Sequence, residues 1–134
     1  MRVLAIVVTH NRCELLKRCI YHLKAQKAPL DEIIVINNGS TDATLEIVEE
    51  MEVKVITQEN LGGAGGWRRG LEYALESSFD AAWLMDDDGY PDIGALSILK
   101  AALLPGVSCA SSIVLQEENP SDLVFPLPIL NKNG

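Results

Sequence analysis

The sequence predicts one α/β domain, in which a mainly parallel β-sheet is covered by helices on both faces to give three layers. Short apolar runs rich in β-branched residues alternate four times with segments of helical periodicity. This is the pattern of βα units joined by right-handed crossovers. The first run, residues 3–8, is continuous and shows no polar alternation, as expected of a strand buried on both faces. With 134 residues, the chain is long enough to bury the core of one such domain.

Each element follows from a local pattern. In the first helical segment, Leu16, Cys19, Ile20 and Leu23 recur on one face, and Pro29 follows as a stop signal. We expect strands at residues 3–8, 33–36, 53–56 and 81–85, with a fifth at about 107–112. We expect helices at residues 13–25, 45–51, 67–79 and 93–104.

Polar or glycine-rich clusters follow the ends of the four expected strands. They cover residues 9–12, 37–42, 60–66 and 86–88. The carboxyl ends of parallel strands share one edge of the sheet, and ligands of open α/β sheets bind beyond that edge. The sequence therefore predicts a ligand site built from these four clusters.

The composition excludes several classes of protein. The net charge of -8 disfavours a nucleic-acid partner, because nucleic-acid footprints are basic. No apolar run approaches the length of a membrane span, and no secretory signal is evident. The three cysteines are odd in number and form no CxxC, which disfavours structural zinc and a disulfide framework. We expect a reducing, cytoplasmic location.

The acidic triplet Asp86-Asp87-Asp88 follows the fourth expected strand directly. Adjacent carboxylates repel one another, and a hard divalent cation would relieve that repulsion by taking carboxylate oxygens as ligands. A solvated acidic turn is the alternative interpretation.

The stretch from Asn60 to Gly66 contains four glycines, whose backbone amides could cradle a phosphate beside a helix N-terminus. It is neither a dinucleotide fingerprint nor a Walker loop, and a flexible connection is the alternative. Asn37 and Asn38 could pair with the edge of a pyrimidine base or form a plain turn. Asp42 is expected to cap a helix.

Two arginines open the third helical segment. Arg68 and Arg69 are adjacent, and neighbouring helical side chains point about 100° apart, so only one is expected to face a ligand. A surface role for both is the alternative. His10 lies in the first cluster, where it could touch a ligand.

Together the four clusters resemble the motifs of the family 2 inverting glycosyltransferases of GT-A fold, a nucleotide-diphospho-sugar transferase fold of Rossmann-like type. The motifs carry the sequences VVTHNR, VINNGSTD, NLGGAGG and WLMDDD, in that order. The resemblance covers residues 1 to about 112. The glycine-rich form with a full aspartate triplet is most similar to the galactofuranosyltransferase and rhamnosyltransferase-like branch.

The resemblance implies a UDP- or dTDP-linked sugar donor, held with Mg²⁺ or Mn²⁺, and a glycan or lipid-linked acceptor. It implies that Asp86 and Asp88 are the metal ligands. Asn38 matches a position often filled by aspartate that binds the uracil edge. The positions matched to nucleotide-sugar contacts are Thr9, His10, Asn11, Arg12, Asn38, Asn60, Gly62, Gly63, Gly65, Arg68, Asp86 and Asp87.

Family members continue well past the triplet into an acceptor half that carries the catalytic base. We therefore expect residues 1–112 to be the donor-binding domain and residues 113–134 to be a proline-containing tail that leads toward a missing acceptor region. No catalytic base can be assigned. The apolar run Leu123 to Leu130 suggests self-association. The resemblance also suggests that the full-length protein acts at the inner face of the membrane.

Two other functions compete with this one. A catalytically incomplete nucleotide-binding or interaction module would share the same α/β plan. A nucleotidyltransferase would too, but those enzymes typically carry a glycine- and lysine- or arginine-rich loop after the first strand. This chain has Thr9-His10-Asn11-Arg12 there.

Overall fold

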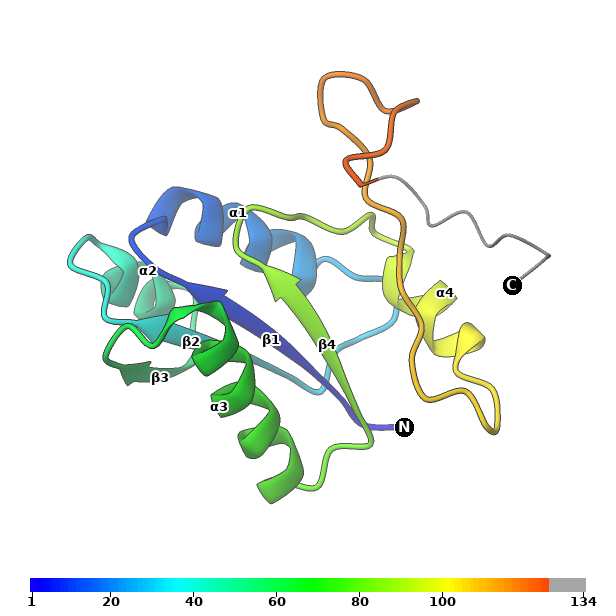
Figure 1. The fold of residues 1–134 in the computed structure, drawn as a ribbon, viewed down its shortest axis with the longest axis horizontal. Helices are drawn as coiled ribbons and strands as arrows, with labels where there is room; N and C mark the ends of the chain where they lie inside the picture. Colours follow the sequence, from blue (N-terminus) through cyan, green and yellow to red (C-terminus); the bar gives the residue numbers. More distant parts are fainter. Residues whose placement is uncertain (126–134) are drawn as a thin grey trace, which may run out of the picture. The chain divides into compact units, whose positions relative to one another are not determined.

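The structure is a computed structural model that describes residues 1–125. Its order of elements is β1 (Val3–Thr9), α1 (Cys13–Lys24), β2 (Glu32–Asn38), α2 (Thr44–Glu50), β3 (Lys54–Gln58), α3 (Gly62–Glu76), β4 (Ala81–Asp86) and α4 (Ala95–Ala102). The four strands form one parallel sheet in the order β3-β2-β1-β4. Figure 1 shows the labelled elements. The predicted alternation of strands and helices is thus confirmed.

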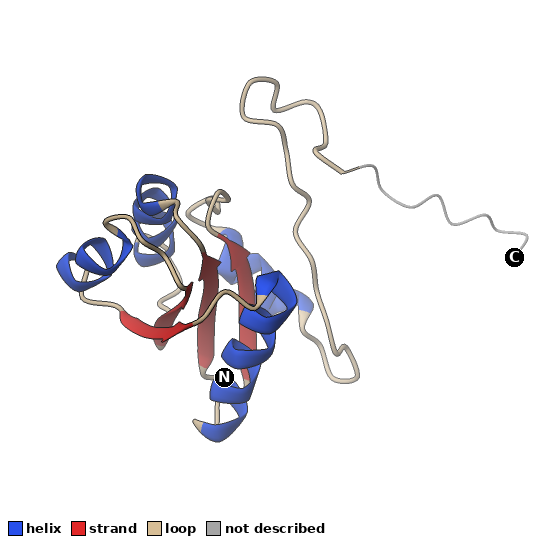
Figure 2. Ribbon diagram, turned by 60° about the vertical axis from the view of Figure 1, so that its left-hand side comes forward, coloured by secondary structure: helices blue, strands red, loops and turns tan. Residues whose placement is uncertain are grey.

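The sheet is the middle of three layers (Figure 2). On one face, Ala5, Val7 and Val35 pack against α1 and α2 through residues such as Leu16 and Val48. On the other face, side chains of β1 and β2 pack against α3 through Ala74, in a cluster that comprises Leu4, Ile6, Ile34, Ile36 and Ala74. Each buried aliphatic side chain contributes roughly 1.5–3 kcal/mol, so the continuous apolar runs account for both the strands and the layering.

The strands extend beyond the apolar runs that predict them. β2 continues through Asn37 and Asn38, which pair in register with Thr57 and Gln58 of β3. Backbone pairing across the sheet carries these polar residues into the strand. They therefore lie in the sheet and not in the turn that the sequence suggested.

The expected fifth strand at residues 107–112 is wrong. That segment has no strand, and its residues are exposed except for half-buried Ala110. Three of its six residues are serines, which favour turns and caps over strands. Further along, Leu115 and Leu123 form an isolated antiparallel bridge.

The chain divides into two compact units, Met1–Ser97 and Ile98–Gly134. All four strands and the four polar clusters belong to the first unit. The functional boundary predicted after residue 112 stays a prediction. Residues 126–134, which include most of the apolar run Leu123 to Leu130 predicted to self-associate, lie outside the described residues. Within residues 1–125, no helix is long and apolar enough to span a membrane.

Candidate functional site

The site lies where the strand order changes direction. From β1 the chain moves outward to β2 and then β3, and it returns to place β4 on the opposite side of β1. Crevices at such a switch point bind ligands in open α/β sheets. Val8 of β1 pairs in register with Asp86 of β4. The next residues, Thr9 and Asp87, therefore meet at the carboxyl edge.

Asp87 faces inward and joins the two strand ends. Its side chain accepts a hydrogen bond of 2.8 Å from Thr9 Oγ1 and lies 3.3 Å from Arg12 Nη1. Thr9 and Asp87 are 2% and 5% exposed. Burial raises the pKa of the Asp87 carboxyl above its ordinary value, while the Thr9 hydrogen bond and the Arg12 charge act against that rise. Both residues are held by protein partners in this conformation, so their predicted ligand contacts stay predictions.

Asp86 and Asp88 are both exposed, on either side of the buried Asp87. Asp88 Oδ2 lies 3.5 Å from Arg12 Nη1, and its side chain is 57% exposed. The Asp86 carbonyl accepts a 3.1 Å bond from Gly89 N, which closes the turn. Within the triplet, Asp87 therefore points inward and joins β4 to β1, whereas Asp86 and Asp88 point outward. This division leaves the pair predicted as metal ligands accessible to a ligand.

Helix α1 holds the main chain of the acidic turn, which the sequence did not reveal. Arg18 Nη2 donates a 3.0 Å bond to the Asp88 carbonyl, and its guanidinium stacks 4.2 Å from the centre of the Tyr90 ring. Cys19 Sγ lies 3.6 Å from the Asp86 carbonyl oxygen. Burial, followed by the charges of Asp87 and Asp88, raises the pKa of the Cys19 thiol to about 12. Cys19 is therefore a neutral, structural thiol beneath the turn.

The loops after β1 and β2 are bound to each other. Asn11 has a positive φ of 52°, a conformation that asparagine tolerates better than most residues. Its Oδ1 accepts bonds from Thr41 N at 2.7 Å and Asp42 N at 3.3 Å, and its backbone N–H donates to Ser40 Oγ at 3.0 Å. These contacts give Asn11 a structural role and place Arg12 at the acidic turn.

Asp42 is not the N-cap residue of a helix, since Arg12 and Ala43 hold those positions, but its carboxylate accepts from the first amide of two helices. One carboxylate oxygen accepts from Thr44 N, the first residue of α2, at 3.1 Å. The other accepts from Cys13 N, the first residue of α1, at 3.1 Å. Helix N-termini leave backbone amides without partners, and a carboxylate satisfies them.

Asn38 lies buried at the end of β2, with 3% of its surface exposed. Its Nδ2 donates to the Gly62 carbonyl at 2.9 Å, and its Oδ1 accepts from Gln58 Nε2 at 2.7 Å. Its own carbonyl lies 2.7 Å from His10 Nδ1. Asn38 therefore connects β2 to the start of α3 and to the first loop. Its predicted contact with a base edge stays a prediction.

The glycine-rich stretch is largely helical, which corrects the expectation of a loop. Gly62 to Gly66 form the beginning of α3, and Asn60 Oδ1 accepts from Gly62 N at 3.0 Å. A Cβ on Gly66 would lie 2.4 Å from Val8 Cγ1, so this glycine allows α3 to approach β1 closely. A Cβ on Gly63 would meet nothing within 4 Å. Tight packing of α3 against the sheet thus explains part of the glycine content. Glycine has a low helix propensity, so the sequence did not predict that α3 begins in this stretch.

Of the two arginines, Arg68 has a surface partner. Arg68 Nε lies 2.8 Å from Glu72 Oε1, one helical turn along α3, and its side chain is 81% exposed. Arg69 is half-buried. The prediction that Arg68 binds the nucleotide would require it to leave Glu72.

The oxygen atoms available at this edge suit a divalent cation that a bound ligand would also coordinate. Within residues 1–125 there is no group of three or more histidine, cysteine, aspartate or glutamate side chains that could hold a metal alone. Mg²⁺ is usually bound by one or two carboxylates together with water and substrate phosphates. Two exposed carboxylates at the carboxyl edge of the sheet, Asp86 and Asp88, fit that requirement.

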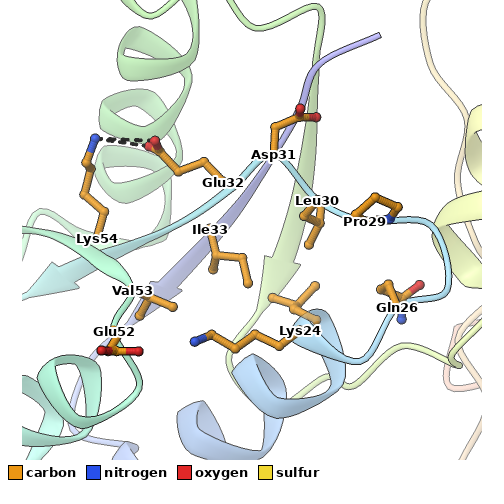
Figure 3. Close-up of a pocket in the computed structure, with 11 residues that line it drawn as sticks. Lys24, Gln26, Pro29, Leu30, Asp31, Glu32, Ile33, Glu52, Val53 and Lys54 are labelled. Atoms are coloured by element: carbon orange, nitrogen blue, oxygen red, sulfur yellow. Dashed lines mark hydrogen bonds and ion pairs between the residues drawn. The ribbon is translucent and has the colours of Figure 1, made fainter.

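A hollow of about 500 Å³ lies elsewhere, near the amino ends of β2 and β3 (Figure 3). Leu30, Ile33 and Val53 line it, and Lys54 lies 3.3 Å from Glu32 Oε1 at its rim. None of its lining residues belongs to the four polar clusters. It is therefore separate from the site at the carboxyl edge.

The fold and this edge define an open α/β domain with exposed carboxylates at the switch point of its sheet. The sequence model of Glycosyl transferase family 2 matches residues 4–122. The chain belongs to that family.

Curated relatives point to one branch of the family. The chain is 37% identical over 130 residues to the galactofuranosyltransferase GlfT1 of Mycolicibacterium smegmatis and 34% identical over 132 residues to that of Mycobacterium tuberculosis. Each match covers 93% of this chain and 43% of the relative. The chain therefore spans less than half the length of these relatives.

Solved structures confirm the fold. The mannosyltransferase PcManGT of Pyrobaculum calidifontis, in complex with GDP-Man and Mn²⁺, superposes with a TM-score of 0.65 at 24% identity, over 72% of this chain and 30% of the other. S. aureus TarS 1–349, in complex with UDP-GlcNAc, gives a TM-score of 0.61 at 28% identity, over 75% and 30%.

Proposed function

We propose that this chain binds the nucleotide diphosphate of a nucleotide-sugar donor together with a divalent cation, as the donor side of a family 2 glycosyltransferase. The observation that carries the proposal is the arrangement at the switch point. Buried Asp87 braces β4 on Thr9 of β1, which leaves Asp86 and Asp88 exposed at the edge where open α/β sheets bind ligands.

The residues at this edge divide the work. Asp86 and Asp88 would hold Mg²⁺ or Mn²⁺, and Arg12 lies within reach of the same turn. A bound cation would supply positive charge that stabilises the nucleoside diphosphate as it leaves the sugar carbon under in-line attack by the acceptor. Asn38 and the first turn of α3 lie beside each other through the bond to Gly62, and they would line the nucleotide side of the site.

The sugar is proposed from the similar proteins. Two relatives named galactofuranosyltransferase, at 34–37% identity, favour galactofuranose. The motif resemblance supports a UDP donor for it, with rhamnose from a dTDP donor as the second candidate. Transfer with inversion to a glycan or lipid-linked acceptor, on the cytoplasmic side of a membrane, completes the proposal. Family membership favours glycosyl transfer over nucleotidyl transfer.

Calorimetry tests the donor site directly. UDP should bind the 134-residue chain more tightly with Mn²⁺ than without it. Asp88→Asn should reduce the Mn²⁺-dependent part on the order of tenfold or more, because one charged ligand is lost. Glu50→Gln is the matched control, since it makes the same charge change on α2, where Glu50 pairs with Lys17.

Three results decide between the candidates. Equal losses in the Asp88 and Glu50 variants would reject Asp88 as a ligand. Absence of Mn²⁺-dependent UDP or dTDP binding in the parent would reject the donor site. Equal affinities for UDP and UDP-galactofuranose, both measured with Mn²⁺, would remove the support for galactofuranose as the transferred sugar.

A further inference from the structure

Arg12 lies between two carboxylates of the acidic turn. Its Nη1 atom is 3.3 Å from Asp87 Oδ1 and 3.5 Å from Asp88 Oδ2. Arg12 is the last residue before α1, and the bonds of Asn11 to the loop after β2 fix the backbone just before it. Hydrogen bonds therefore fix the loop that places the Arg12 guanidinium at the acidic turn.

The two contacts of Arg12 differ in their surroundings. The Asp87 side chain is 7% exposed and also accepts the 2.8 Å bond from Thr9. The Asp88 side chain is 57% exposed, and the Arg12 side chain is 54% exposed. Exposed ion pairs are weak and exchange readily with solvent and other ions. The contact of Arg12 with Asp87 is thus the more stable one, and its contact with Asp88 is the one that a ligand can replace.

A cation held by Asp86 and Asp88 would lie close to the Arg12 guanidinium. Its charge would be repelled by Arg12, and Asp88 would have to give up Arg12 as a partner. We propose that Arg12 opposes binding of a bare divalent cation, so that the turn accepts the cation chiefly together with a diphosphate. This inference rests on the proposed function, because the turn must be a cation site.

The diphosphate would reverse the effect of Arg12. Phosphate oxygens are strong acceptors for guanidinium N–H groups, so an arginine released from Asp88 would gain a new partner. The negative diphosphate would also offset the repulsion between the cation and Arg12. Under the proposal, Arg12 couples the two ligands: each binds better when the other is present.

The test measures Mn²⁺ binding without nucleotide, by electron paramagnetic resonance of free Mn²⁺ on the full chain. Arg12→Gln should tighten Mn²⁺ binding by about tenfold, because a unit positive charge near a divalent ion is removed. Arg12→Lys keeps the charge and should stay close to the parent. Lys17→Gln is the control: it removes one positive charge from α1, but Lys17 pairs with Glu50 of α2.

A second titration adds UDP. In the parent, UDP should tighten Mn²⁺ binding. In Arg12→Gln, UDP should tighten it less, and the difference should be about as large as the tenfold gain expected for Mn²⁺ binding without UDP. Circular dichroism and thermal unfolding of each variant establish that it is folded. A purely structural role for Arg12 would predict weaker Mn²⁺ binding in the variant, which is the opposite sign.

Some results would overturn the proposal. They are unchanged or weaker bare Mn²⁺ binding in Arg12→Gln relative to Lys17→Gln, or no binding by either at millimolar Mn²⁺. A failure of the proposed function gives a different pattern. In that case UDP would leave Mn²⁺ binding unaltered in every variant, while the comparison of bare Mn²⁺ affinities would still decide the role of Arg12.

Discussion

Thr9 Oγ1 donates a 2.8 Å hydrogen bond to Asp87 Oδ2 across the ends of β1 and β4. The two residues are 78 positions apart in the chain and both are almost fully buried. The bond joins neighbouring strands at the point where the strand order reverses. It therefore fixes the position from which Asp86 and Asp88 extend.

Thr9→Val removes this donor while keeping the shape of the side chain. We expect the free energy of unfolding to fall by about 1–3 kcal/mol, since a buried charged acceptor loses a hydrogen bond. Urea denaturation measures the change. Thr41→Val is the control: Thr41 is exposed, and its hydroxyl lies 3.4 Å from Asn11 Oδ1. A surface substitution of this kind should stay within about 0.5 kcal/mol. Equal effects in both variants would mean that the Thr9 bond contributes nothing.

The Cys19 thiol should resist alkylation. Burial and the nearby carboxylates raise its pKa to about 12, so little thiolate exists at pH 8, and the side chain is inaccessible. Iodoacetamide labelling followed by peptide mass spectrometry should modify exposed Cys109 rapidly and Cys19 only after denaturation. Rapid labelling of Cys19 in the folded protein would contradict its placement beneath the turn.

The same thiol gives a pH dependence with a definite sign. The ordinary pKa of 9.0 applies to the unfolded chain, and the folded value is about 12. Between these values the unfolded state loses a proton that the folded state keeps, so the free energy of unfolding decreases as pH rises. Cys19→Ala should remove that contribution. Equal pH slopes for the variant and the parent would show that Cys19 does not titrate differently on unfolding.

Gln26, which follows α1, should hold the segment after the acidic turn against the end of that helix. The side chain is 8% exposed; its Nε2 donates to the Asp92 carbonyl at 2.8 Å, and its Oε1 accepts from Leu96 N at 3.0 Å. Gln26→Leu leaves the buried Leu96 N–H without its partner and should cost about 1–3 kcal/mol. Amide exchange at Leu96 should accelerate.

Gln26→Glu separates the two contacts. Glutamate keeps an acceptor for Leu96 N but loses the donor to Asp92, so exchange at Leu96 should stay closer to that of the parent. If both variants accelerate exchange equally, the Leu96 bond is not what protects this amide.

The positions of the two central strands, β1 and β2, could be predicted from the sequence because burial on both faces demands continuous apolar residues. Val3 to Val8 is such a run, and β1 is buried along almost its whole length. The ends of the strands could not be predicted in the same way. Asn37 and Asn38 belong to β2 through backbone pairing with β3, and such long-range pairing leaves no local pattern.

The candidate site was predictable as a set of loops but not as a set of contacts. The clusters at the strand ends do lie at the same edge, as parallel strands require. Nothing in the triplet itself distinguishes Asp87 from its neighbours. Its role comes from Thr9 and Arg12, more than 70 residues earlier in the chain. The same holds for Arg18 and Cys19 on α1, which support the turn through its carbonyl groups.

The glycines of α3 should respond to alanine in opposite directions. At Gly66 a Cβ would lie 2.4 Å from Val8 Cγ1 and 3.2 Å from Asn38 Nδ2, so Gly66→Ala should force α3 away from the sheet. Overpacking of this kind typically costs about 1–3 kcal/mol. At Gly63 the added methyl meets nothing within 4 Å, and alanine at a position whose backbone conformation it can adopt stabilises a protein by about 0.4–1 kcal/mol. Gly63→Ala should therefore stabilise the fold.

Urea denaturation of these two variants tests the packing of α3, and UDP titration with Mn²⁺ then tests the predicted ligand contact of Gly63. If the donor approaches the backbone there, Gly63→Ala should weaken UDP binding although it stabilises the free protein. A structural defect cannot produce that combination, because a destabilised site would lose stability and affinity together. If the Gly63→Ala variant is more stable and its UDP affinity is unchanged, Gly63 does not belong to the donor site. Ligand binding would then not explain why this position is a glycine.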